Sequence, residues 1–310
     1  MYIEKKRIGN NSYTYLRGSS RLNGKVKTRT VAYLGKGDIS KRQIDKKIKE
    51  ISESENINKK FLNDEQVARL SKIKEDFNKK IKKLDSKLLS DMFRDFKTYY
   101  IYNTNAIEGN TLTLEETNLL LNENKSPEGK DLREVYDHIN EKDTFDFLLE
   151  KKPMINKDSI IGIHKKLMEK IDKRVGKLRQ HKVRVFGASF ETTPPEYLDA
   201  DISILLKWLN NTKLHPLILS ALFHEKFERI HPFYDGNGRT GRMLSNLILI
   251  RNGFPPIVIK NKDRKQYYSA LSLGHKADLD KTGINECKPI VEFFYMQMIF
   301  TYEEIFFKWG

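Results

Sequence analysis

The sequence predicts a mainly α-helical protein with a small β module at its N-terminal end. From about residue 40 onward, apolar residues recur every three or four positions, as on one face of a helix. The first 35 residues are instead rich in Tyr, Thr and Val around an Asn-Gly pair, which indicates strands. A chain of 310 residues can hold one large domain and a smaller module. We expect a basic β-hairpin module at 1–38, a helical connector at 39–92 and a helical core at 93–310.

The composition argues against membrane-spanning and disulfide-stapled proteins. No stretch reaches the roughly 18 apolar residues that a transmembrane helix needs, and the N-terminus MYIEKKRIGNNSYTY lacks the apolar run of a secretory signal. The only cysteine, Cys287, cannot form an internal disulfide. Its surroundings, NECKP, offer no base or glycine turn, so we expect a plain surface or half-buried thiol rather than a catalytic one. A cytoplasmic location is therefore expected.

The positive charge of the chain is concentrated at its front. Residues 1–100 carry 26 Lys and Arg against 13 Asp and Glu, so they hold most of the net charge of +15. This asymmetry indicates contact between residues 1–90 and nucleic acid or another polyanion, rather than a general property of the protein.

The front module is predicted to be a hairpin, because Asn23-Gly24 between two β-rich runs favours a type I′ turn. Five cations flank its tip: Arg17, Arg21, Lys25, Lys27 and Arg29. A two-residue loop would divide the arginines at 17 and 21 from the other three, whereas one extra loop residue would put all five on one face. A solvated tip and a polyanion contact are both consistent with this pattern. The hairpin faintly resembles the leading β-ribbon of some transposase-type proteins.

The connector is predicted to hold two helices. Ile44, Ile48 and Ile51 mark a short first helix, and the polar stretch ESENINKK is expected to break it. Apolar residues from Val67 to Leu88 then step by three, four or seven, which indicates a long amphipathic helix. Its apolar face would pack on a neighbour, and pairing with a second subunit would give a homodimer.

The core is predicted to be helical almost throughout. Residues 91–103 continue as a helix that Gly109 ends, and Thr113 with Glu116 forms a capping box for the next one. Further helices are expected near 130–150, 158–171, 199–211, 216–230, 238–251, 263–273 and 288–308. The one strand-like stretch among them is HKVRVFGASF.

The segment HPFYDGNGRTGR, residues 231–242, follows one predicted helix and opens another. The first helix must stop at His231 because Pro232 disfavours the α conformation for the residue before it. Gly236, Asn237 and Gly238 then bend the backbone, so that free amides and the positive end of the next helix can face a phosphate.

The charged residues of this segment indicate a nucleotide site. Arg239 and Arg242 lie three residues apart on one helical face, and two guanidinium groups beside one turn imply several phosphates. Asp235 would repel a phosphate unless it held Mg²⁺. His231 is the nearby group that titrates near neutral pH and is the candidate general base. The pattern predicts metal-assisted transfer from a nucleotide polyphosphate.

The same segment matches the active-site signature of the Fic family, HPFx[DE]GNGRxxR, position for position, so the chain resembles that family. The resemblance implies a helical Fic core that moves AMP from ATP to a Tyr, Thr or Ser hydroxyl of a protein, which could be the chain itself, with Mg²⁺. It implies the following roles: His231 deprotonates the hydroxyl, Asp235 binds Mg²⁺, Gly236, Asn237 and Gly238 cradle the phosphates, Arg239 neutralises them, and Arg242 holds the γ-phosphate. A phosphate-transferring relative has lysine in place of Gly238, so glycine here favours nucleotidyl transfer.

The resemblance extends over roughly residues 95–300. HKVRVFGASFETTPPEYL resembles the β-hairpin flap that docks the target by strand pairing. RKQYYSAL, with Tyr267 and Tyr268, resembles the segment that closes the nucleotide pocket. His224 has a counterpart in relatives, and we interpret it here as a buried packing residue.

Thr104, Glu108 and Gly109 fit the inhibitory pattern of the family, carried on a helix at about 95–109. A Glu108 carboxylate paired with Arg242 would take the charge that the γ-phosphate needs. Two alternatives stay open. Glu108 could instead help water to remove AMP from a modified target, or the protein could be a nucleic-acid-binding regulator in which the Fic core serves as a sensor.

Overall fold

The computed structural model describes residues 2–22, 25–37, 39–183 and 191–309, and in these ranges the chain is mainly helical, as predicted. It divides into two compact units, Met1–Ile57 and Asn58–Gly310, which we describe separately. The predicted domain boundaries at residues 38 and 92 stay a prediction. None of the helices in the described ranges is both long and apolar enough to cross a bilayer.

The first unit contains an antiparallel sheet of three strands in the order β1 (Tyr2–Ile8), β2 (Asn11–Leu22) and β3 (Lys25–Lys36). Leu22 pairs with Lys25, which is the register of a two-residue loop; Asn23-Gly24 itself lies outside the described residues. The sequence did not predict β1. Its segment YIEKKRI is exposed at nearly every position and shows no alternation of apolar and polar residues, so the pattern of a half-buried strand is missing.

One face of this sheet packs on the first helix, α1 (Lys41–Phe61). Leu16 and Leu34, from neighbouring strands, form a small core with Ile44, and further isoleucines of the helix and the preceding loop cover its edge. The predicted period of Ile44, Ile48 and Ile51 therefore marks the face that α1 turns to the sheet.

Two predictions for the connector were wrong. The stretch ESENINKK does not break α1, because its Glu and Lys residues are good helix formers and their side chains are exposed or half-buried. The run from Val67 to Leu88 is not one helix but α2 (Asp64–Lys83) followed by α3 (Ser86–Ile107). Asp85 separates them as an N-cap, since its carboxylate accepts a hydrogen bond of 2.9 Å from the Leu88 amide.

The other predicted helices are present. The Thr113–Glu116 capping box opens α4 (Leu114–Glu123). The chain continues through α5 (Leu132–Lys151), α6 (Lys157–Leu167), η1 (Pro195–Tyr197), α7 (Leu198–Asn211), α8 (Pro216–Ile230), α9 (Asn237–Arg251), η2 (Asn261–Asp263), α10 (Arg264–Gly274), α11 (Ile284–Thr301) and the π-helical turn η3 (Tyr302–Phe306). Within HKVRVFGASF, residues 184–190 lie outside the described residues, and the described positions beside them are not strand.

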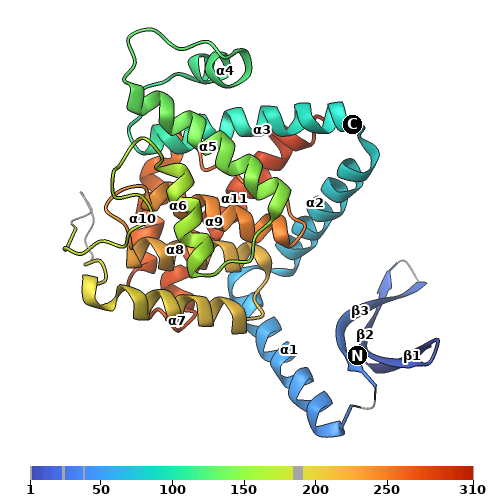
Figure 1. The fold of residues 1–310 in the computed structure, drawn as a ribbon. Coiled ribbons are helices and arrows are strands. Elements are labelled where there is room, and N and C mark those ends of the chain that lie inside the picture. The colour runs from blue at the N-terminus through green and yellow to red at the C-terminus, as the bar shows by residue number, and fades with distance from the viewer. Residues whose placement is uncertain (1, 23–24, 38, 184–190, 310) are drawn as a thin grey trace. The chain divides into compact units, whose positions relative to one another are not determined.

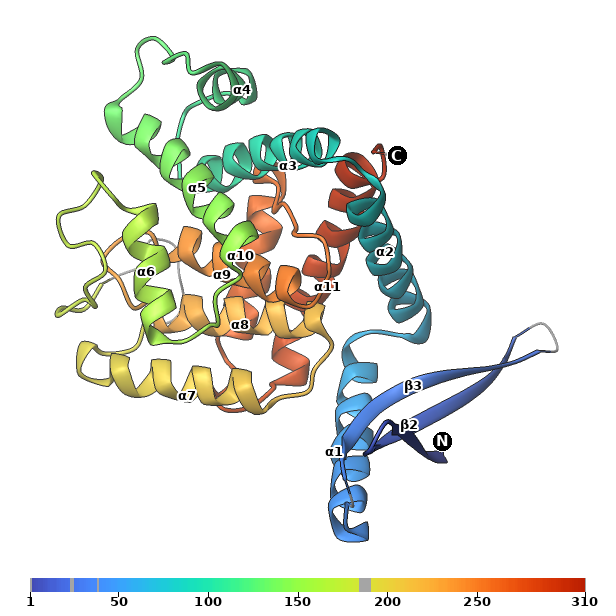
Figure 2. The same ribbon diagram turned by 45° about the vertical axis from the view of Figure 1, so that its right-hand side comes forward.

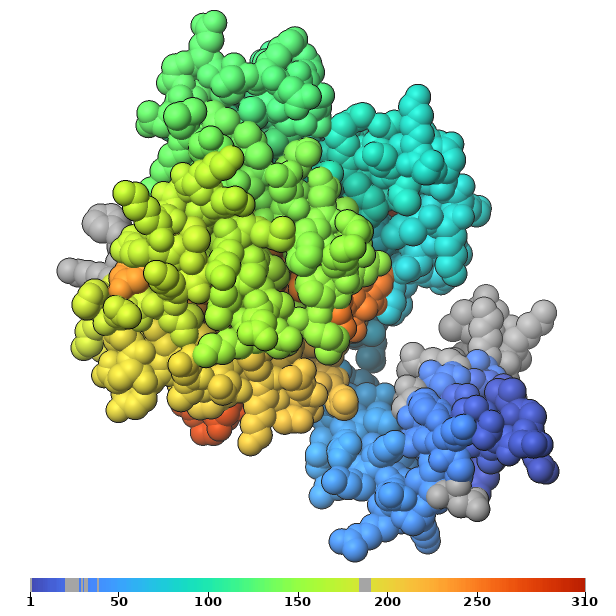
Figure 3. All heavy atoms as spheres, in the orientation of Figure 1, coloured from blue at the N-terminus to red at the C-terminus, as the bar shows by residue number. Residues whose placement is uncertain are grey.

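Helix α9 runs through the middle of the second unit, where α8, α6, α5 and α3 pack against it (Figures 1 and 2). Nearly all of its residues are buried, and so are most of those of α8, as expected for central helices. On the face that the space-filling view shows, orange, the colour of the part of the chain that includes α9, appears only in small patches at the edges of the green and yellow surface (Figure 3). The loop between α8 and α9, residues 231–236, therefore starts and ends on rigid elements.

Candidate active site

His231 lies directly after the last turn of α8 and has a left-handed backbone conformation, with φ 51° and ψ 60°. This conformation is uncommon for a residue with a side chain, and it turns the imidazole back toward the helix end. Nδ1 of the ring lies 3.3 Å from the carbonyl oxygen of Glu228. Burial lowers the pKa of His231 to about 4, and the nearby Arg179 guanidinium acts in the same direction. The imidazole is therefore neutral at pH 7 and able to accept a proton.

The loop after His231 is fixed from within. Phe233 is fully buried and stacks on the ring of His164 at a centroid distance of 3.6 Å. The side chain of Asn237 accepts a hydrogen bond of 2.9 Å from the Phe233 amide and donates one of 2.8 Å to the Phe233 carbonyl. Both ends of the Asn237 amide are thus used inside the loop, which leaves its backbone as the part of Asn237 available to a phosphate.

Gly236 is the N-cap of α9 and has φ +75°, a conformation that favours glycine. A Cβ atom at this position would stand 2.5 Å from the sulfur of Met168. The tight turn that opens α9 therefore depends on glycine for both its backbone conformation and its space.

Asp235 lies at the start of this turn and faces two guanidinium groups. Its carboxylate pairs with Arg133 and lies 3.7 Å from a guanidinium nitrogen of Arg239. Oδ1 also accepts a hydrogen bond of 2.6 Å from the amide of Gly236. Burial acts to raise the pKa of Asp235, but Arg239, the Gly236 amide and Arg133 together lower it. Asp235 is therefore an ionised carboxylate at pH 7, already surrounded by positive charge.

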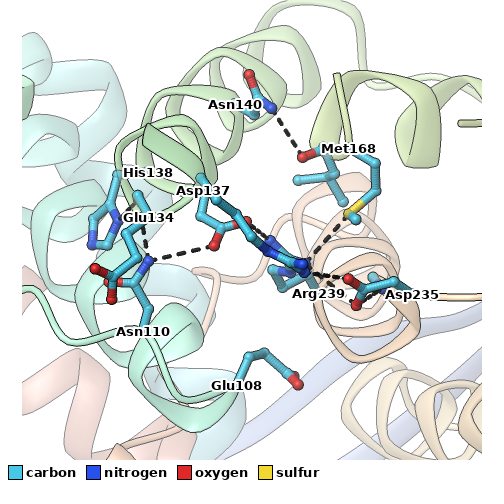
Figure 4. A network of polar contacts seen from close by, with 12 residues as sticks. Glu108, Asn110, Glu134, Asp137, His138, Asn140, Met168, Asp235 and Arg239 are labelled. Atoms are coloured by element: carbon cyan, nitrogen blue, oxygen red, sulfur yellow. Dashed lines mark hydrogen bonds and ion pairs between the residues drawn. The ribbon is translucent and has the colours of Figure 1, made fainter. Parts of the chain in front are cut away.

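Arg239 lies between two carboxylates on different elements, Asp235 in the loop and Asp137 on α5 (Figure 4). Its side chain is buried. The second oxygen of Asp137 accepts a hydrogen bond of 3.4 Å from Asn110, which also donates to the Glu134 carbonyl at 3.1 Å. A chain of polar contacts therefore joins Arg239 to the loop that follows α3.

Arg242 is held by the C-terminal end of α3. Its Nη2 atom lies 2.6 Å from Oε1 of Glu108 and donates to the Thr104 carbonyl at 3.1 Å, while Nε donates to the Thr104 hydroxyl at 2.7 Å. The guanidinium is buried, whereas the Glu108 side chain is 36% exposed. Glu108 caps α3, and Gly109 follows it with φ +96°. The distant segments 104–109 and 231–242 thus meet at one charged contact.

Behind Arg242 lies a buried polar group from two more helices. The Tyr267 hydroxyl, on α10, lies 2.5 Å from Nε2 of His224 and 3.5 Å from a guanidinium nitrogen of Arg242. Burial lowers the pKa of His224 to about 3, and Arg242 adds to this effect, so this ring is a neutral packing residue. Tyr267 is the buried tyrosine of the pair, while Tyr268 is 41% exposed.

Arg179 ties the predicted flap to this loop. Its Nε donates 2.7 Å to the His231 carbonyl, and its other nitrogens donate to the carbonyls of His181 and Thr193, which flank the undescribed residues 184–190. Its backbone amide donates 3.0 Å to the Pro232 carbonyl. The described base of the flap and the loop after α8 therefore share one buried arginine.

The structure brings the predicted residues of 231–242 together at one end of α9, with Thr104 and Glu108 against Arg242. Partners of these residues that were not predicted include Asp137, Arg133, Arg179 and Glu228. One signal for the first existed, because Asp137, Glu141 and Thr144 are polar residues at helical spacing on the buried face of α5. The other three carry no local pattern that names a partner.

Among the described residues, no group of three or more His, Cys, Asp or Glu side chains is arranged to hold a metal ion. Asp235 nevertheless suits a magnesium ion that arrives with a nucleotide. Such an ion takes one or two carboxylates, phosphate oxygens and water, and Asp235 already attracts the cationic groups of Arg133 and Arg239.

Comparisons with known proteins agree with this geometry. Residues 154–249 match the model of the Fic/DOC family. The chain is 35% identical over 203 residues to protein adenylyltransferase fic-1 of Caenorhabditis elegans, which covers 63% of this chain and 40% of the relative. It is 35% identical over 188 residues to protein adenylyltransferase Fic of Nematostella vectensis, which covers 58% of this chain and 44% of the relative. The chain thus spans about two fifths of the length of these relatives.

Solved structures show the same fold. A Fic domain containing signaling protein from Bacteroides thetaiotaomicron has a TM-score of 0.69 at 26% identity and covers 77% of this chain and 95% of its own. Fic-1 from C. elegans, residues 134–508, has a TM-score of 0.67 at 27% identity and covers 86% of this chain and 76% of its own. The helical core described above is therefore a Fic-type core.

Proposed function

This chain belongs to the Fic/DOC family through the domain at residues 154–249, and from that premise we propose that it is a protein adenylyltransferase. It transfers AMP from ATP to a Tyr, Thr or Ser hydroxyl of a protein. The observation that carries the proposal is the juxtaposition, at one end of α9, of a neutral histidine, a glycine turn at the helix N-terminus and two buried arginines.

His231 is proposed to act as the general base. Its Nδ1 edge faces the Glu228 carbonyl, which favours the tautomer with a proton on Nδ1 and a lone pair on Nε2. The incoming hydroxyl gives its proton to Nε2, and its oxygen forms a bond to the α-phosphorus. The bond between that phosphorus and the oxygen bridging to the β-phosphate breaks, and pyrophosphate leaves.

The phosphates are proposed to bind at the N-terminus of α9. The amides of Gly236, Asn237 and Gly238 supply donors at the positive end of the helix dipole, and Arg239 and Arg242 neutralise charge. The Gly236 amide would have to exchange its hydrogen bond to Asp235 for one to a phosphate. Asp235 would hold Mg²⁺, which neutralises phosphate charge and orients the leaving group. Asp235 would have to exchange its contact with Arg133 for that ion.

The resting protein is proposed to be autoinhibited. Glu108 pairs with Arg242, and Thr104 accepts a hydrogen bond from the same guanidinium. Because a γ-phosphate would need Arg242, ATP and Glu108 compete for one cation. A hypothetical Cβ on Gly238 would meet the Glu108 carboxylate, so glycine at this position also leaves the inhibitory side chain its space.

Intact mass spectrometry of the Glu108→Gly protein after incubation with ATP and Mg²⁺ tests the proposal. We expect a gain of one AMP unit on the chain itself or on an added target, little gain for the parent protein, and none for Glu108→Gly combined with His231→Ala. The proposal fails if the Glu108→Gly protein binds ATP but acquires no AMP.

Removal of AMP from a modified target protein is the second candidate function, and the position of Glu108 favours it. Glu108 is partly exposed and lies on the same site as His231, where a carboxylate can position water. Incubating the parent protein with an AMP-modified target, without ATP, separates the two directions. The cytoplasmic location, homodimer pairing and contact with nucleic acid stay predictions from the sequence.

A further inference from the structure

Helix α8 and the residue that follows it bring three ionisable residues together. His224 and Glu228 lie one turn apart on the same side of α8, and His231, the residue directly after the helix, places its Nδ1 atom 3.9 Å from Oε2 of Glu228. His224 is the buried partner of Tyr267, and His231 is the proposed base. Glu228 lies between them and has no role in the function proposed above.

The fold makes room for Glu228 where α8 meets α9. A Cβ atom on Gly241 of α9 would stand 2.9 Å from Oε1 of Glu228 and 2.8 Å from Nδ1 of His224. Glycine at 241 thus lets the two helices approach with polar side chains between them. The Glu228 side chain is only 12% exposed, and within the described residues its Oε1 atom has no hydrogen-bond partner. Keeping a carboxyl group here costs free energy.

The other oxygen of Glu228 faces the base. Oε2 lies 3.9 Å from Nδ1 of His231, and the backbone carbonyl of the same glutamate lies 3.3 Å from that nitrogen. Two oxygen atoms of one residue therefore face the Nδ1 edge of the imidazole. Small rotations of either side chain would bring the carboxyl oxygen into hydrogen-bond range.

The groups around Glu228 come from four helices. They are Arg242 on α9, Glu108 at the end of α3, Tyr267 on α10 and His224 on α8 itself. Burial raises the pKa of Glu228 to about 8, the Glu108 carboxylate adds to this, and Arg242 opposes it. At pH 7 the side chain is a neutral carboxylic acid in the resting protein, and its carbonyl oxygen is an acceptor.

We propose that Glu228 is a positioning residue for His231: its buried carboxyl oxygen joins its backbone carbonyl in holding the proton on Nδ1, so that Nε2 is free to accept the proton of the target hydroxyl. The inference rests on the proposed function in that His231 is taken as the base. A histidine in the opposite tautomer would present an N–H to the hydroxyl and could not take its proton.

The test uses the full-length Glu108→Gly protein as the parent and adds Glu228→Gln or Glu228→Leu. Glutamine keeps the shape and an acceptor oxygen, whereas leucine removes both oxygens of the side chain. Glu225→Leu is the matched control, because Glu225 is also a buried carboxyl group of α8 but lies beside Cys287 and His275. The readouts are kcat and KM for ATP in AMP transfer, and the ¹⁵N shifts of the His231 ring, assigned by comparison with His231→Ala.

We expect the parent and Glu228→Gln to hold His231 with its proton on Nδ1 and to differ less than threefold in kcat. Glu228→Leu should show a substantial fraction of the other tautomer and at least a tenfold lower kcat, with KM for ATP changed less than twofold. Glu225→Leu should leave the His231 ring signals and kcat as in the parent.

The inference is overturned if Glu228→Leu keeps the parent tautomer and kcat, or if Glu228→Gln loses as much activity as Glu228→Leu. It is also overturned if His231 in the parent carries its proton on Nε2, a result that needs no variant at position 228 to fold. Because the ring signals are read without nucleotide, they test the inference even if the parent transfers no AMP. A Glu108→Gly parent that transfers no AMP would instead count against the proposed function.

Discussion

At the scale of single residues, Arg242 is the cation for which, in the proposed function, Glu108 and the nucleotide compete. It is buried, and its partners Glu108 and Thr104 both come from α3. If Arg242 binds the γ-phosphate, removing its side chain must weaken the binding of ATP and hardly change the binding of AMP, which has no γ-phosphate.

In the Glu108→Gly background, Arg242→Ala should weaken ATP binding roughly 10- to 100-fold, the range of one hydrogen-bonded charge contact of about 1.5–3 kcal/mol. AMP binding should change less than threefold. Isothermal titration calorimetry with both nucleotides measures this, with Arg251→Ala at the other end of α9 as the control. Equal losses for ATP and AMP would contradict a γ-phosphate role.

Gly236 permits a prediction about stability. Alanine there must adopt φ +75° and place a methyl group 2.5 Å from the Met168 sulfur, so Gly236→Ala should lower the free energy of unfolding by about 1–3 kcal/mol. Gly162 lies inside α6 with open space around it, and Gly162→Ala should stabilise the protein by about 0.5–1 kcal/mol. Urea denaturation measures the free energy of unfolding of both variants. A Gly236→Ala protein as stable as the parent would contradict the predicted strain at position 236.

At the scale of elements, the C-terminal end of α3 carries the proposed inhibitory residue Glu108, and the loop after it is tied to α5. Asn110 donates to Glu134 and Asp137, and its own oxygen accepts a hydrogen bond of 3.1 Å from the Leu112 amide. These contacts fix where α3 ends and hence where Glu108 points.

Asn110→Ala should therefore raise AMP transfer above that of the parent protein, but less than Glu108→Gly does, because the Glu108–Arg242 pair itself remains. The rate of AMP incorporation at fixed ATP measures the effect. Asn118→Ala, which removes a surface contact with Asn122 on α4, should leave the rate unchanged. An Asn110→Ala rate no higher than that of the parent would show that the loop does not restrain α3.

Local patterns located elements better than they located partners. The cap formed by Thr113 and Glu116 sets the start of α4 as expected, because both residues act within one turn. The break expected at ESENINKK did not occur, since polarity without a cap or proline does not end a helix. The pairing of Glu108 with Arg242 spans 134 residues and was predicted through the family resemblance. Arg179 was missed because a long-range partner leaves no periodic signal. The helical spacing of the buried polar residues around Asp137 could have marked it, but that spacing does not identify Arg239 as its partner.

At the scale of the whole molecule, buried ionisable groups set the pH range of stability. Six histidines have lowered pKa values; burial lowers that of His138, and it lowers those of His164, His215, His224, His231 and His275 to about 4 or 3. In the unfolded chain they bind protons below about pH 6.5, whereas in the folded chain they stay neutral to lower pH. Their contribution to stability is therefore lost as the pH falls below 6.5.

Three buried glutamates act in the opposite direction. Burial raises the pKa of Glu141 and Glu228 to about 8 and that of Glu225 to about 7. Above about pH 4.5 the unfolded chain releases these protons while the folded chain keeps them, so their contribution falls as the pH rises toward 8. Because the six histidines oppose these glutamates only below about pH 6.5, the stability should be greatest near that pH.

Thermal unfolding at pH 5, 6.5 and 8 measures this dependence, and Tm should be highest at pH 6.5. Glu141 is fully buried and its carboxyl makes no hydrogen bond within the described residues. Glu141→Gln should remove up to about 1.4 kcal/mol per pH unit of the alkaline decline. If the stability of Glu141→Gln falls with rising pH as steeply as that of the parent, groups other than Glu141 cause the decline.

The charge of the chain permits a last prediction, about its front unit. Residues 1–57 carry 14 Lys and Arg against 6 Asp and Glu, so this small part holds a net +8 of the total +15. The unpredicted strand β1 adds three exposed cations, Lys5, Lys6 and Arg7, to those of the hairpin. If the unit binds nucleic acid, each phosphate contact must release counterions on binding.

The full chain should therefore bind a short DNA duplex or RNA hairpin with an affinity that falls steeply with salt. If the chain makes three phosphate contacts, its affinity should fall about fortyfold when the salt concentration rises from 50 to 200 mM. The fragment Asn58–Gly310, which is the second compact unit, should bind at least tenfold more weakly at 50 mM. Fluorescence anisotropy over a salt titration gives both numbers, and heparin competition separates nucleic-acid binding from binding of any polyanion. Equal binding by the full chain and the fragment would mean that the front unit is not a nucleic-acid module, and that its cations are simply solvated.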